Sequence, residues 1–460
     1  MTGLINNSTI QQLDMILIHK ATIINEGNSF TGSLLLEGER ISRIFKGDVP
    51  EAVLNTCRQV IDARGLWLMP GVIDDQVHFR DPGLTHKGDI HTESRAAVAG
   101  GVTSYMEMPN TNPQTVTWDA LCRKMEMAAG KSVVNFSFYL GATNDNMEEL
   151  KKADLKQICG VKVFMGSSTG NMLVDNDKAL QRIFAEVDTL IATHCEKEEI
   201  IRKNIDIYKK EFGDFIPIQY HPLIRSAEAC YQSSAHAVEL ADKYGSKLHV
   251  LHLSTARELS LFDAKPLDGK KITAEVCVHH LWFSDADYEK MGSRIKWNPA
   301  VKTAEDREAL REGLKTGKLD VVATDHAPHL LSEKEGGVLQ AASGGPLVQH
   351  SLQVMFELMK KGLYNKELVV EKMCHAPAQL FQVRERGFIR EGYYADLVLV
   401  DPFKPYTVTP ENLFYKCGWS PFEGNTFSCS IHTTFVNGNI VYQNGSLTEN
   451  VLGKALEFNK

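Results

Sequence analysis

Short apolar runs recur along the middle of the chain, and most of them end in polar, ionisable side chains. Eight such runs lie between residues 70 and 385, and they start near residues 71, 102, 134, 161, 190, 247, 271 and 321. Helix-like stretches separate them, among them residues 89–101, 225–245 and 303–317. This alternation is typical of parallel βα units. Eight such units close most simply into a (β/α)8, TIM-like barrel. An open doubly wound sheet is the alternative, but the chain lacks the GxGxxG turn that would support it.

The residue pattern at the two ends of the chain differs from that of residues 70–385. Residues 14–62 and 395–445 contain short alternating segments broken by Gly, Asn and Asp, and Asn437-Gly438 is a typical hairpin turn. We therefore expect an α/β protein in which residues 1–69 and 386–460 pair to form a smaller β-sandwich domain. Residues 70–385 would form the catalytic barrel.

Composition excludes several classes of protein. The chain has 460 residues, too many for one simple core, and carries a net charge of -8, which disfavours a nucleic-acid partner. No apolar stretch approaches the roughly 20 residues that span a membrane, and residues 1–14 lack the features of a signal peptide. Nine cysteines occur without any CxxC pair, which argues against a disulfide framework or a zinc knuckle. We expect a cytoplasmic protein that acts on a small molecule.

The polar strand ends indicate a metal site. In a barrel, the C-terminal ends of all strands converge on one face, where active sites lie. Imidazole and carboxylate groups are typical zinc ligands. A single histidine on a strand is more often an ordinary core residue, so the prediction rests on the shared position of several side chains. These are His78, Lys162, His194, His252 and Asp325.

Lys162 stands between Val161 and Val163 in one of the apolar runs. A buried charge is unfavourable without a partner, and a buried lysine can lose its proton. The neutral amine could then take up CO₂ and become a carbamate, whose two oxygens can bridge two cations. A carbamate on Lys162 is therefore our hypothesis.

Eight short motifs in this chain match the sequence pattern of one protein family. The chain resembles dihydroorotase, in the class I branch of the cyclic amidohydrolases within the amidohydrolase superfamily, from about residue 14 to 445. The motifs that carry this resemblance are HFRDPG (78–83), MPNTNP (108–113), VKVFMG (161–166), THCE (193–196), HLST (252–255), KWNPAVKT (296–303), ATDHAPH (323–329) and SPFEGNTF (420–427).

The resemblance implies a metal centre and a reaction. His78, Lys162 and Asp325 would hold one Zn²⁺, and His194, His252 and the Lys162 carbamate would hold a second. Asp325 would take a proton from water and pass it to the leaving nitrogen. The implied reaction is the reversible hydrolysis of L-dihydroorotate to N-carbamoyl-L-aspartate, a step of pyrimidine (UMP) biosynthesis.

The resemblance also implies a substrate site. Arg80, Asn110 and His329 would bind the substrate carboxylate, and Asn298 would contact the pyrimidine ring. A planar guanidinium suits a carboxylate because it can bind both oxygens. Each residue also has an ordinary interpretation: a surface ion pair for Arg80, turn formation for Asn110 and Asn298, and an ordinary loop position for His329.

Gln76 departs from the family pattern, which has His-x-His where this chain has Gln76-Val77-His78. A neutral amide is a poor zinc ligand. The metal pair could persist with Gln76 as a weak ligand, the second metal could act alone, or catalysis could be lost. We favour a working enzyme with one or two Zn²⁺ per subunit, because the other site residues remain.

Two other functions stay open at this point. One is a hydantoinase, dihydropyrimidinase or allantoinase, which share the barrel and the metals. The other is a non-catalytic barrel that supports aspartate carbamoyltransferase. By analogy with the family, we expect a homodimer.

Overall fold

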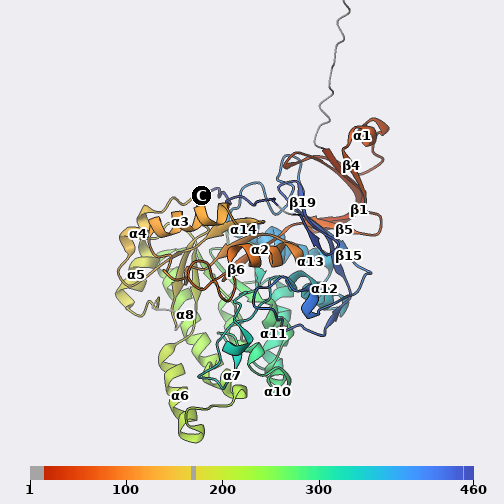
Figure 1. The fold of residues 1–460 in the computed structure, drawn as a ribbon. Helices are drawn as coiled ribbons and strands as arrows, with labels where there is room; N and C mark the ends of the chain where they lie inside the picture. The colour runs from red at the N-terminus through yellow and green to blue at the C-terminus, as the bar shows by residue number, and fades with distance from the viewer. Residues whose placement is uncertain (1–14, 167–171, 449) are drawn as a thin grey trace, which may run out of the picture.

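Strands from both ends of the chain meet in one nine-stranded sheet in the computed structural model, which describes residues 15–166, 172–448 and 450–460 (Figure 1). The strand order across this sheet is β20-β19-β18-β15-β5-β1-β2-β3. The remaining strand, β4, lies outside this linear order and pairs with β1. The antiparallel pair of β5 and β15 joins the two halves, so the expected β domain built from both ends is confirmed. Its strands are β1 (Met15–Asn25), β2 (Asn28–Glu37), β3 (Arg40–Phe45), β4 (Gln59–Asp62), β5 (Trp67–Pro70), β15 (Leu397–Asp401), β18 (Ser430–Val436), β19 (Asn439–Gln443) and β20 (Ser446–Leu447).

Both faces of the β1 region are covered by apolar side chains. Ile16 and Ile18 belong to one buried cluster, whereas Met15 and Leu17 belong to another. Successive side chains of a strand point to opposite faces, so this division follows from the alternating sequence.

The barrel strands are parallel throughout. They are β6 (Val72–Val77), β7 (Val102–Glu107), β8 (Asn135–Phe138), β9 (Leu140–Gly141), β10 (Val161–Phe164), β11 (Ile191–His194), β12 (Leu248–Val250), β13 (Ile272–Cys277) and β14 (Val321–Ala323). They form a three-stranded sheet, β6-β7-β8, and a six-stranded sheet that runs from β9 to β14.

Two features turn these sheets into one ring. Only Tyr139 separates β8 from β9, so these two act as a single interrupted strand. A parallel bridge between Val77 and His326 closes the other side, and the His78 N–H donates to the His326 carbonyl at 2.7 Å. The eight predicted runs therefore form the predicted barrel.

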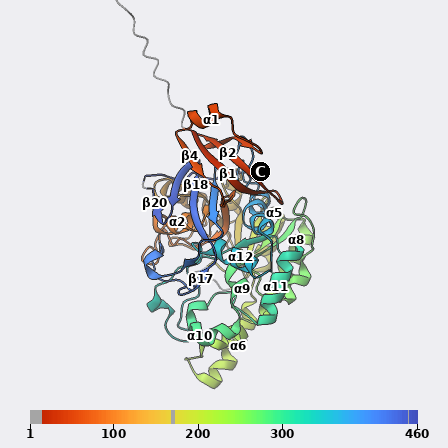
Figure 2. The ribbon, with the colours of Figure 1, turned by 90° about the vertical axis from the view of Figure 1, so that its right-hand side faces the viewer.

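Most of the helices surround this ring, whereas α1 packs within the β domain (Figures 1 and 2). The helices are α1 (Glu51–Thr56), α2 (Ile90–Ala99), α3 (Trp118–Ala129), α4 (Met147–Lys152), α5 (Asp177–Glu186), α6 (Glu198–Phe212), α7 (His221–Ile224), α8 (Ala227–Tyr244), α9 (Val278–Trp282), α10 (Tyr288–Met291), α11 (Ala304–Thr316), α12 (Ser351–Lys360), α13 (Lys366–Val370) and α14 (Ala376–Leu380). In both views α1 and the β domain lie at one end of the molecule, and α6 and α10 lie at the other.

Local sequence signals set the bounds of the longer helices. The Ser226 hydroxyl accepts from the Ala229 N–H at the start of α8, and Gly245 ends this helix with φ +69°. Thr303 and Asp306 form a capping box at the start of α11, and Gly317 ends it with φ +83°. Such N-caps and left-handed glycine ends are the usual helix boundaries. The predicted helical stretches correspond to α2, α8 and α11.

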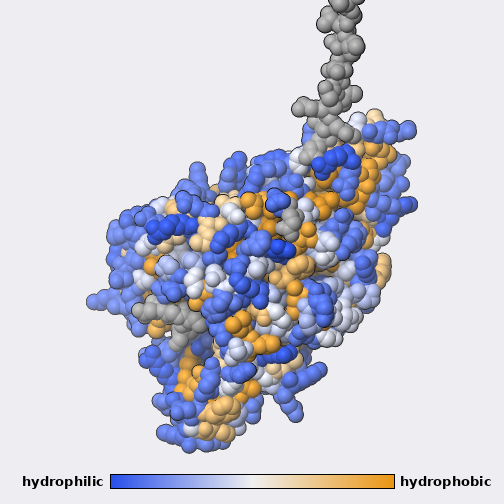
Figure 3. Space-filling view, viewed as in Figure 1, coloured by the Kyte–Doolittle hydropathy of each residue, from blue (hydrophilic) through white to orange (hydrophobic). Residues whose placement is uncertain are grey.

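The face of the molecule in Figure 3 is mostly hydrophilic, with hydrophobic residues in separate groups. Within the described residues, no helix is long and apolar enough to cross a membrane. The first 14 residues, on which the signal-peptide expectation rests, lie outside the described part of the chain.

A buried ion pair fixes α3 against the barrel. Lys124 Nζ lies 3.0 Å from Glu107 Oε2 at the end of β7, and the two side chains are 2% and 0% exposed. Glu107 Oε1 also accepts from the Phe79 N–H at 2.9 Å, so this carboxylate supports the strand end that carries His78.

Replacing Lys124 with Met should lower the free energy of unfolding by about 3–5 kcal/mol, because it leaves the Glu107 carboxylate buried without a counter-charge. Urea denaturation followed by circular dichroism measures this loss. The double variant Glu107→Gln/Lys124→Met should recover much of it, since no buried charge remains. An unchanged midpoint for Lys124→Met would contradict this role.

Candidate active site

One cavity at the C-terminal ends of the barrel strands brings together all but one of the predicted site residues. It is lined by Gln76, His78, Arg80, Asn110, Lys162, Phe164, His194, His252, Asn298, Asp325, Ala327, Ser343 and Gly344. The exception is His329. The predicted residues among them, from Gln76 to Asp325, thus face the same small space although up to 249 positions separate them in the sequence, as the strand-end pattern predicts.

Three of these residues have an unusual backbone conformation. Arg80, His252 and Asp325 have φ values of +71°, +39° and +49°. Non-glycine residues in the left-handed region are strained by about 1–3 kcal/mol, and such residues cluster at functional sites.

His194 and His252 present ring nitrogens to each other. His194 Nδ1 lies 3.0 Å from His252 Nε2, and His194 Nε2 lies 3.1 Å from Glu196 Oε2. Burial lowers the pKa of His194 and holds the pKa of His252 well below its usual value, so both rings are neutral near pH 7. The His194 Nε2–H then donates to Glu196, and its Nδ1 lone pair faces His252. Arg225 pairs with the same Glu196 carboxylate.

Lys162 lies in the same part of the cavity as a buried amine. Its Nζ has no hydrogen-bond partner among the described residues, and it lies 4.5 Å from the centre of the Phe164 ring. Burial lowers the pKa of Lys162 to about 7, so a large fraction of the amine is neutral at neutral pH. This is the state in which a lysine can react with CO₂.

These donors fit a metal ion. Zn²⁺ binds imidazole nitrogens at about 2.0–2.1 Å, which places two such ligands about 3 Å apart. A carboxylate behind a histidine, as Glu196 is behind His194, is the usual support for a metal-bound ring. Nδ1 of His252 and Nζ of Lys162 are also buried atoms without a partner in the described chain.

His78 and Asp325 form the opposite side of this group. His78 Nε2 lies 3.0 Å from Asp325 Oδ1, and His78 Nδ1 lies 2.8 Å from Asn110 Oδ1. Gln76 Nε2 also contacts Asp325 Oδ1, at 3.3 Å. The structure therefore places Asn110 behind the His78 ring and Gln76 beside Asp325.

Arg80 lines the other half of the cavity. Its Nε donates to the Pro328 carbonyl at 3.1 Å, and its Nη2 lies 3.0 Å from His329 Nε2. Burial lowers the pKa of Arg80 to about 10, so the guanidinium keeps its charge at neutral pH. Lys87 Nζ lies 3.0 Å from the other ring nitrogen of His329. His329 thus stands behind Arg80, where it holds the guanidinium instead of facing the cavity.

Asn298 offers an unused acceptor. Its Oδ1 is buried, lines the cavity and has no hydrogen-bond partner among the described residues. A buried amide oxygen without a partner is unfavourable, so this atom is suited to accept from a ligand N–H.

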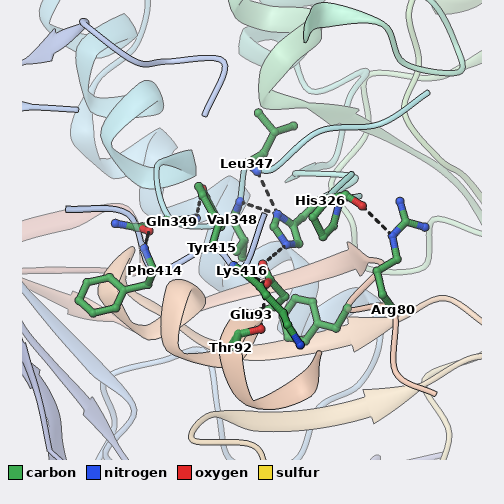
Figure 4. A network of polar contacts seen from close by, with 12 residues as sticks. Arg80, Thr92, Glu93, His326, Leu347, Val348, Gln349, Phe414, Tyr415 and Lys416 are labelled. Carbon is green, nitrogen blue, oxygen red and sulfur yellow. Dashed lines mark hydrogen bonds and ion pairs between the residues drawn. The ribbon is translucent and has the colours of Figure 1, made fainter. Parts of the chain in front are cut away.

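A polar network that the sequence did not indicate surrounds His326, the residue after Asp325 (Figure 4). His326 Nδ1 accepts from the Leu347 N–H at 2.9 Å, so its Nε2–H donates to Glu93 Oε2, also at 2.9 Å. The other Glu93 oxygen accepts from the Lys416 N–H at 3.1 Å. Glu93 thereby connects α2 to His326 and to the backbone of Lys416.

A second cluster of metal-binding residue types lies inside the barrel. Asp75, His249 and Glu275 are buried, and one donor atom of each lies within 4.8 Å of the others. Burial alone would lower the pKa of His249, but the two carboxylates outweigh it and raise this pKa to about 9. Glu275 Oε1 accepts from the N–H of His252 at 2.9 Å, so the cluster supports the backbone of a predicted metal ligand. Sequence reasoning left these residues without a role.

Comparison with known proteins identifies the family. The profile of the Amidohydrolase family matches residues 67–441, which is most of the chain. The chain belongs to the amidohydrolase family. The predicted hydrolase of this superfamily and the predicted fold are both confirmed.

Several relatives of this amidohydrolase differ in their substrates. A dihydroorotase from Methanosarcina mazei is 33% identical over 418 residues, which cover 88% of this chain and 90% of that protein. An allantoinase from Bacillus velezensis is 30% identical over 438 residues, with 94% of each chain covered. An L-hydantoinase (dihydropyrimidinase) structure from Arthrobacter aurescens matches with a TM-score of 0.88 and 27% identity, covering 95% of this chain and 97% of that one.

Glu196 should tune metal binding in this amidohydrolase. Glu196→Gln should weaken zinc affinity roughly 10- to 100-fold, because a neutral amide polarises the His194 ring less than a carboxylate does. Competition with a chromophoric chelator measures this affinity. Glu199→Gln, an exposed change in the same segment, is the control and should bind zinc like the wild type. Equal affinity for both variants would refute the role of Glu196.

Proposed function

We propose that this amidohydrolase is a dihydroorotase, which hydrolyses the cyclic amide of L-dihydroorotate reversibly to N-carbamoyl-L-aspartate in pyrimidine biosynthesis. One observation carries the proposal. The charged guanidinium of Arg80, 4% exposed, shares a cavity with the donors suited to a metal ion. The substrate combines a cyclic amide with a carboxylate, so it needs both kinds of group.

Arg80 would bind the substrate carboxylate. Its described partners use the Nε–H and one N–H of Nη2, which leaves both N–H groups of Nη1 and the second one of Nη2 for a carboxylate. Because His329 and Pro328 fix the plane of the guanidinium, little side-chain entropy is lost on binding. The unused Oδ1 of Asn298 would accept an N–H of the pyrimidine ring. Asn110 would act mainly by orienting His78.

Zinc is the metal we propose. His194, His252 and Lys162 would hold it, with Lys162 in its carbamate form, and His78 and Asp325 lie close by. Bound Zn²⁺ supplies a Lewis acid for the amide carbonyl and lowers the pKa of water. Asp325, which faces the cavity, would accept the proton of the attacking water and deliver it to the ring nitrogen that leaves.

Two other activities are the natural competitors. The allantoinase and hydantoinase relatives share this fold, but allantoin and simple hydantoins lack the ring carboxylate that Arg80 would bind. A non-catalytic barrel has Gln76 in its favour, whereas the remaining cavity residues favour catalysis. A homodimer, an association with aspartate carbamoyltransferase and a cytoplasmic location stay predictions.

A substrate panel tests the proposal directly. The purified protein with added Zn²⁺ should convert L-dihydroorotate and N-carbamoyl-L-aspartate into each other, and the ultraviolet absorbance of the ring amide follows the reaction. Allantoin, hydantoin and dihydrouracil should react at least 100-fold more slowly. Faster hydrolysis of any of these three would overturn the substrate, and no turnover of any compound would favour the non-catalytic barrel.

Arg80→Lys should raise KM for dihydroorotate roughly 10- to 100-fold, because a lysine loses one of two charge-assisted hydrogen bonds to the carboxylate. Steady-state kinetics in the hydrolytic direction measure the change. The exposed Arg43→Lys is the matched control and should leave KM as it is. An unaltered KM in Arg80→Lys would show that the carboxylate binds elsewhere.

A further inference from the structure

Lys334 is a buried amine that three backbone carbonyls surround. The residue is 2% exposed, and its Nζ donates to the carbonyls of Ala342 at 2.7 Å and Gly344 at 2.6 Å. The third acceptor is the carbonyl of Lys296, at 3.2 Å. An ammonium group has three N–H donors, so these contacts use all of them. Because burial of an unbonded amine is unfavourable, the amine and the three carbonyls keep one another in place.

The carbonyls that Lys334 binds belong to a wall of the candidate active site. Ser343 and Gly344 line the cavity, and they lie in residues 338–345, which we call the cavity loop. Lys334 binds the carbonyls of the residues on both sides of Ser343. The Gly344 N–H donates to the Lys296 carbonyl at 2.8 Å, so one oxygen receives both the loop and the lysine. Lys334 itself lies outside the lining of the cavity.

The cavity loop depends on lysine side chains for its backbone contacts. Residues 338–345 are all described and contain no helix or strand. Buried backbone carbonyls need hydrogen-bond donors, and regular structure supplies none here. A second buried amine, Lys296 Nζ, donates to the Val338 carbonyl at 2.8 Å and to the Ala341 carbonyl. The two lysines therefore bind the carbonyls of residues 338, 341, 342 and 344.

The loop backbone also packs closely against the last barrel strand end. Gly344 has a φ of +122°, which favours glycine, and a Cβ there would lie 2.6 Å from the Ala327 carbonyl. The Ala327 N–H donates to the Gly345 carbonyl at 3.0 Å. The side of the loop towards Ala327 is thus filled. A loop released by the loss of Lys334 would move away from Ala327, which enlarges the cavity.

We propose that Lys334 is a positioning residue for the substrate, which fixes the cavity loop and thereby the width of the cavity that Arg80 and Asn298 also line. A wall that is already in place loses little conformational entropy when a ring binds against it. Lys334 acts only through the loop, because it does not reach the cavity. This inference deepens the proposed function, on which the choice of substrate rests.

Lys334→Met tests the proposal because it keeps the length of the side chain and removes its N–H donors. KM for dihydroorotate should rise roughly 10-fold, whereas kcat should change less than about 3-fold, because the wall contributes to binding and Asp325 stays in place. The zinc content per chain should equal that of the wild type. Lys334→Gln, which keeps two N–H donors, should raise KM less than Lys334→Met does.

Lys372→Met is the matched control for these kinetics. Lys372 is also a buried amine that donates to a backbone carbonyl, that of Leu319 at 2.8 Å, but this carbonyl precedes β14 instead of following it. KM in Lys372→Met should equal that of the wild type. An unchanged KM in Lys334→Met, or an equal rise in both methionine variants, would contradict the positioning role.

Amide hydrogen exchange of the zinc-loaded protein tests the loop without any substrate. In Lys334→Met, the peptide that covers residues 338–345 should exchange roughly 10-fold faster or more, because the Ala342 and Gly344 N–H groups lose their fixed acceptors. Peptides from α8 and α11 should exchange as in the wild type. Unchanged exchange of the loop would overturn the proposal, and so would faster exchange throughout the chain, since the lysine would then serve folding as a whole.

The two proposals fail in different ways. If the wild type does not convert dihydroorotate, the proposed function is wrong, but hydrogen exchange still decides whether Lys334 fixes the loop. The kinetic comparison then uses whichever cyclic amide the wild type hydrolyses.

Discussion

The hydrogen bond that closes the barrel determines the geometry of the site. The His78 N–H donates to the His326 carbonyl and joins the first strand of the ring to the last. Because this contact fixes β6 beside β14, the His78 ring reaches Asp325 and the Arg80 guanidinium reaches the Pro328 carbonyl. Without closure, these side chains would belong to opposite edges of an open sheet.

Closure produces a cavity with two chemically different halves. One half contains buried nitrogens, and among the described residues Lys162 Nζ has no hydrogen-bond partner, a state that a cation bound to its carbamate would relieve. The other half contains the buried guanidinium of Arg80, which attracts an anion. A cyclic amide with a carboxylate matches both halves at once, whereas an uncharged cyclic amide would offer no anionic group to the free N–H groups of Arg80.

Sequence reasoning reached the barrel, the paired termini and nine of the thirteen residues that line the cavity, because parallel strands align their C-terminal ends. It did not reach Asp75, His249 and Glu275. The register of β6 against β7 shifts between Asp74 and Val77, and a bulge breaks the alternation that assigns side chains to faces. As a result, the neighbours Asp75 and Gln76 both contact residues of the barrel interior. The sequence assigns His329 to the substrate carboxylate, whereas the coordinates show its ring bonded to the Arg80 guanidinium and outside the lining of the cavity. Ser343 and Gly344 line the cavity from a loop whose path no sequence periodicity describes.

The most direct test of this account is the position of the metal. Diffraction from zinc-loaded crystals at the zinc absorption edge gives its location independently of activity. The account predicts an anomalous peak bound by His194, His252 and the modified Lys162. A principal peak at Asp75, His249 and Glu275, or a bare Lys162 amine far from any ion, would contradict it.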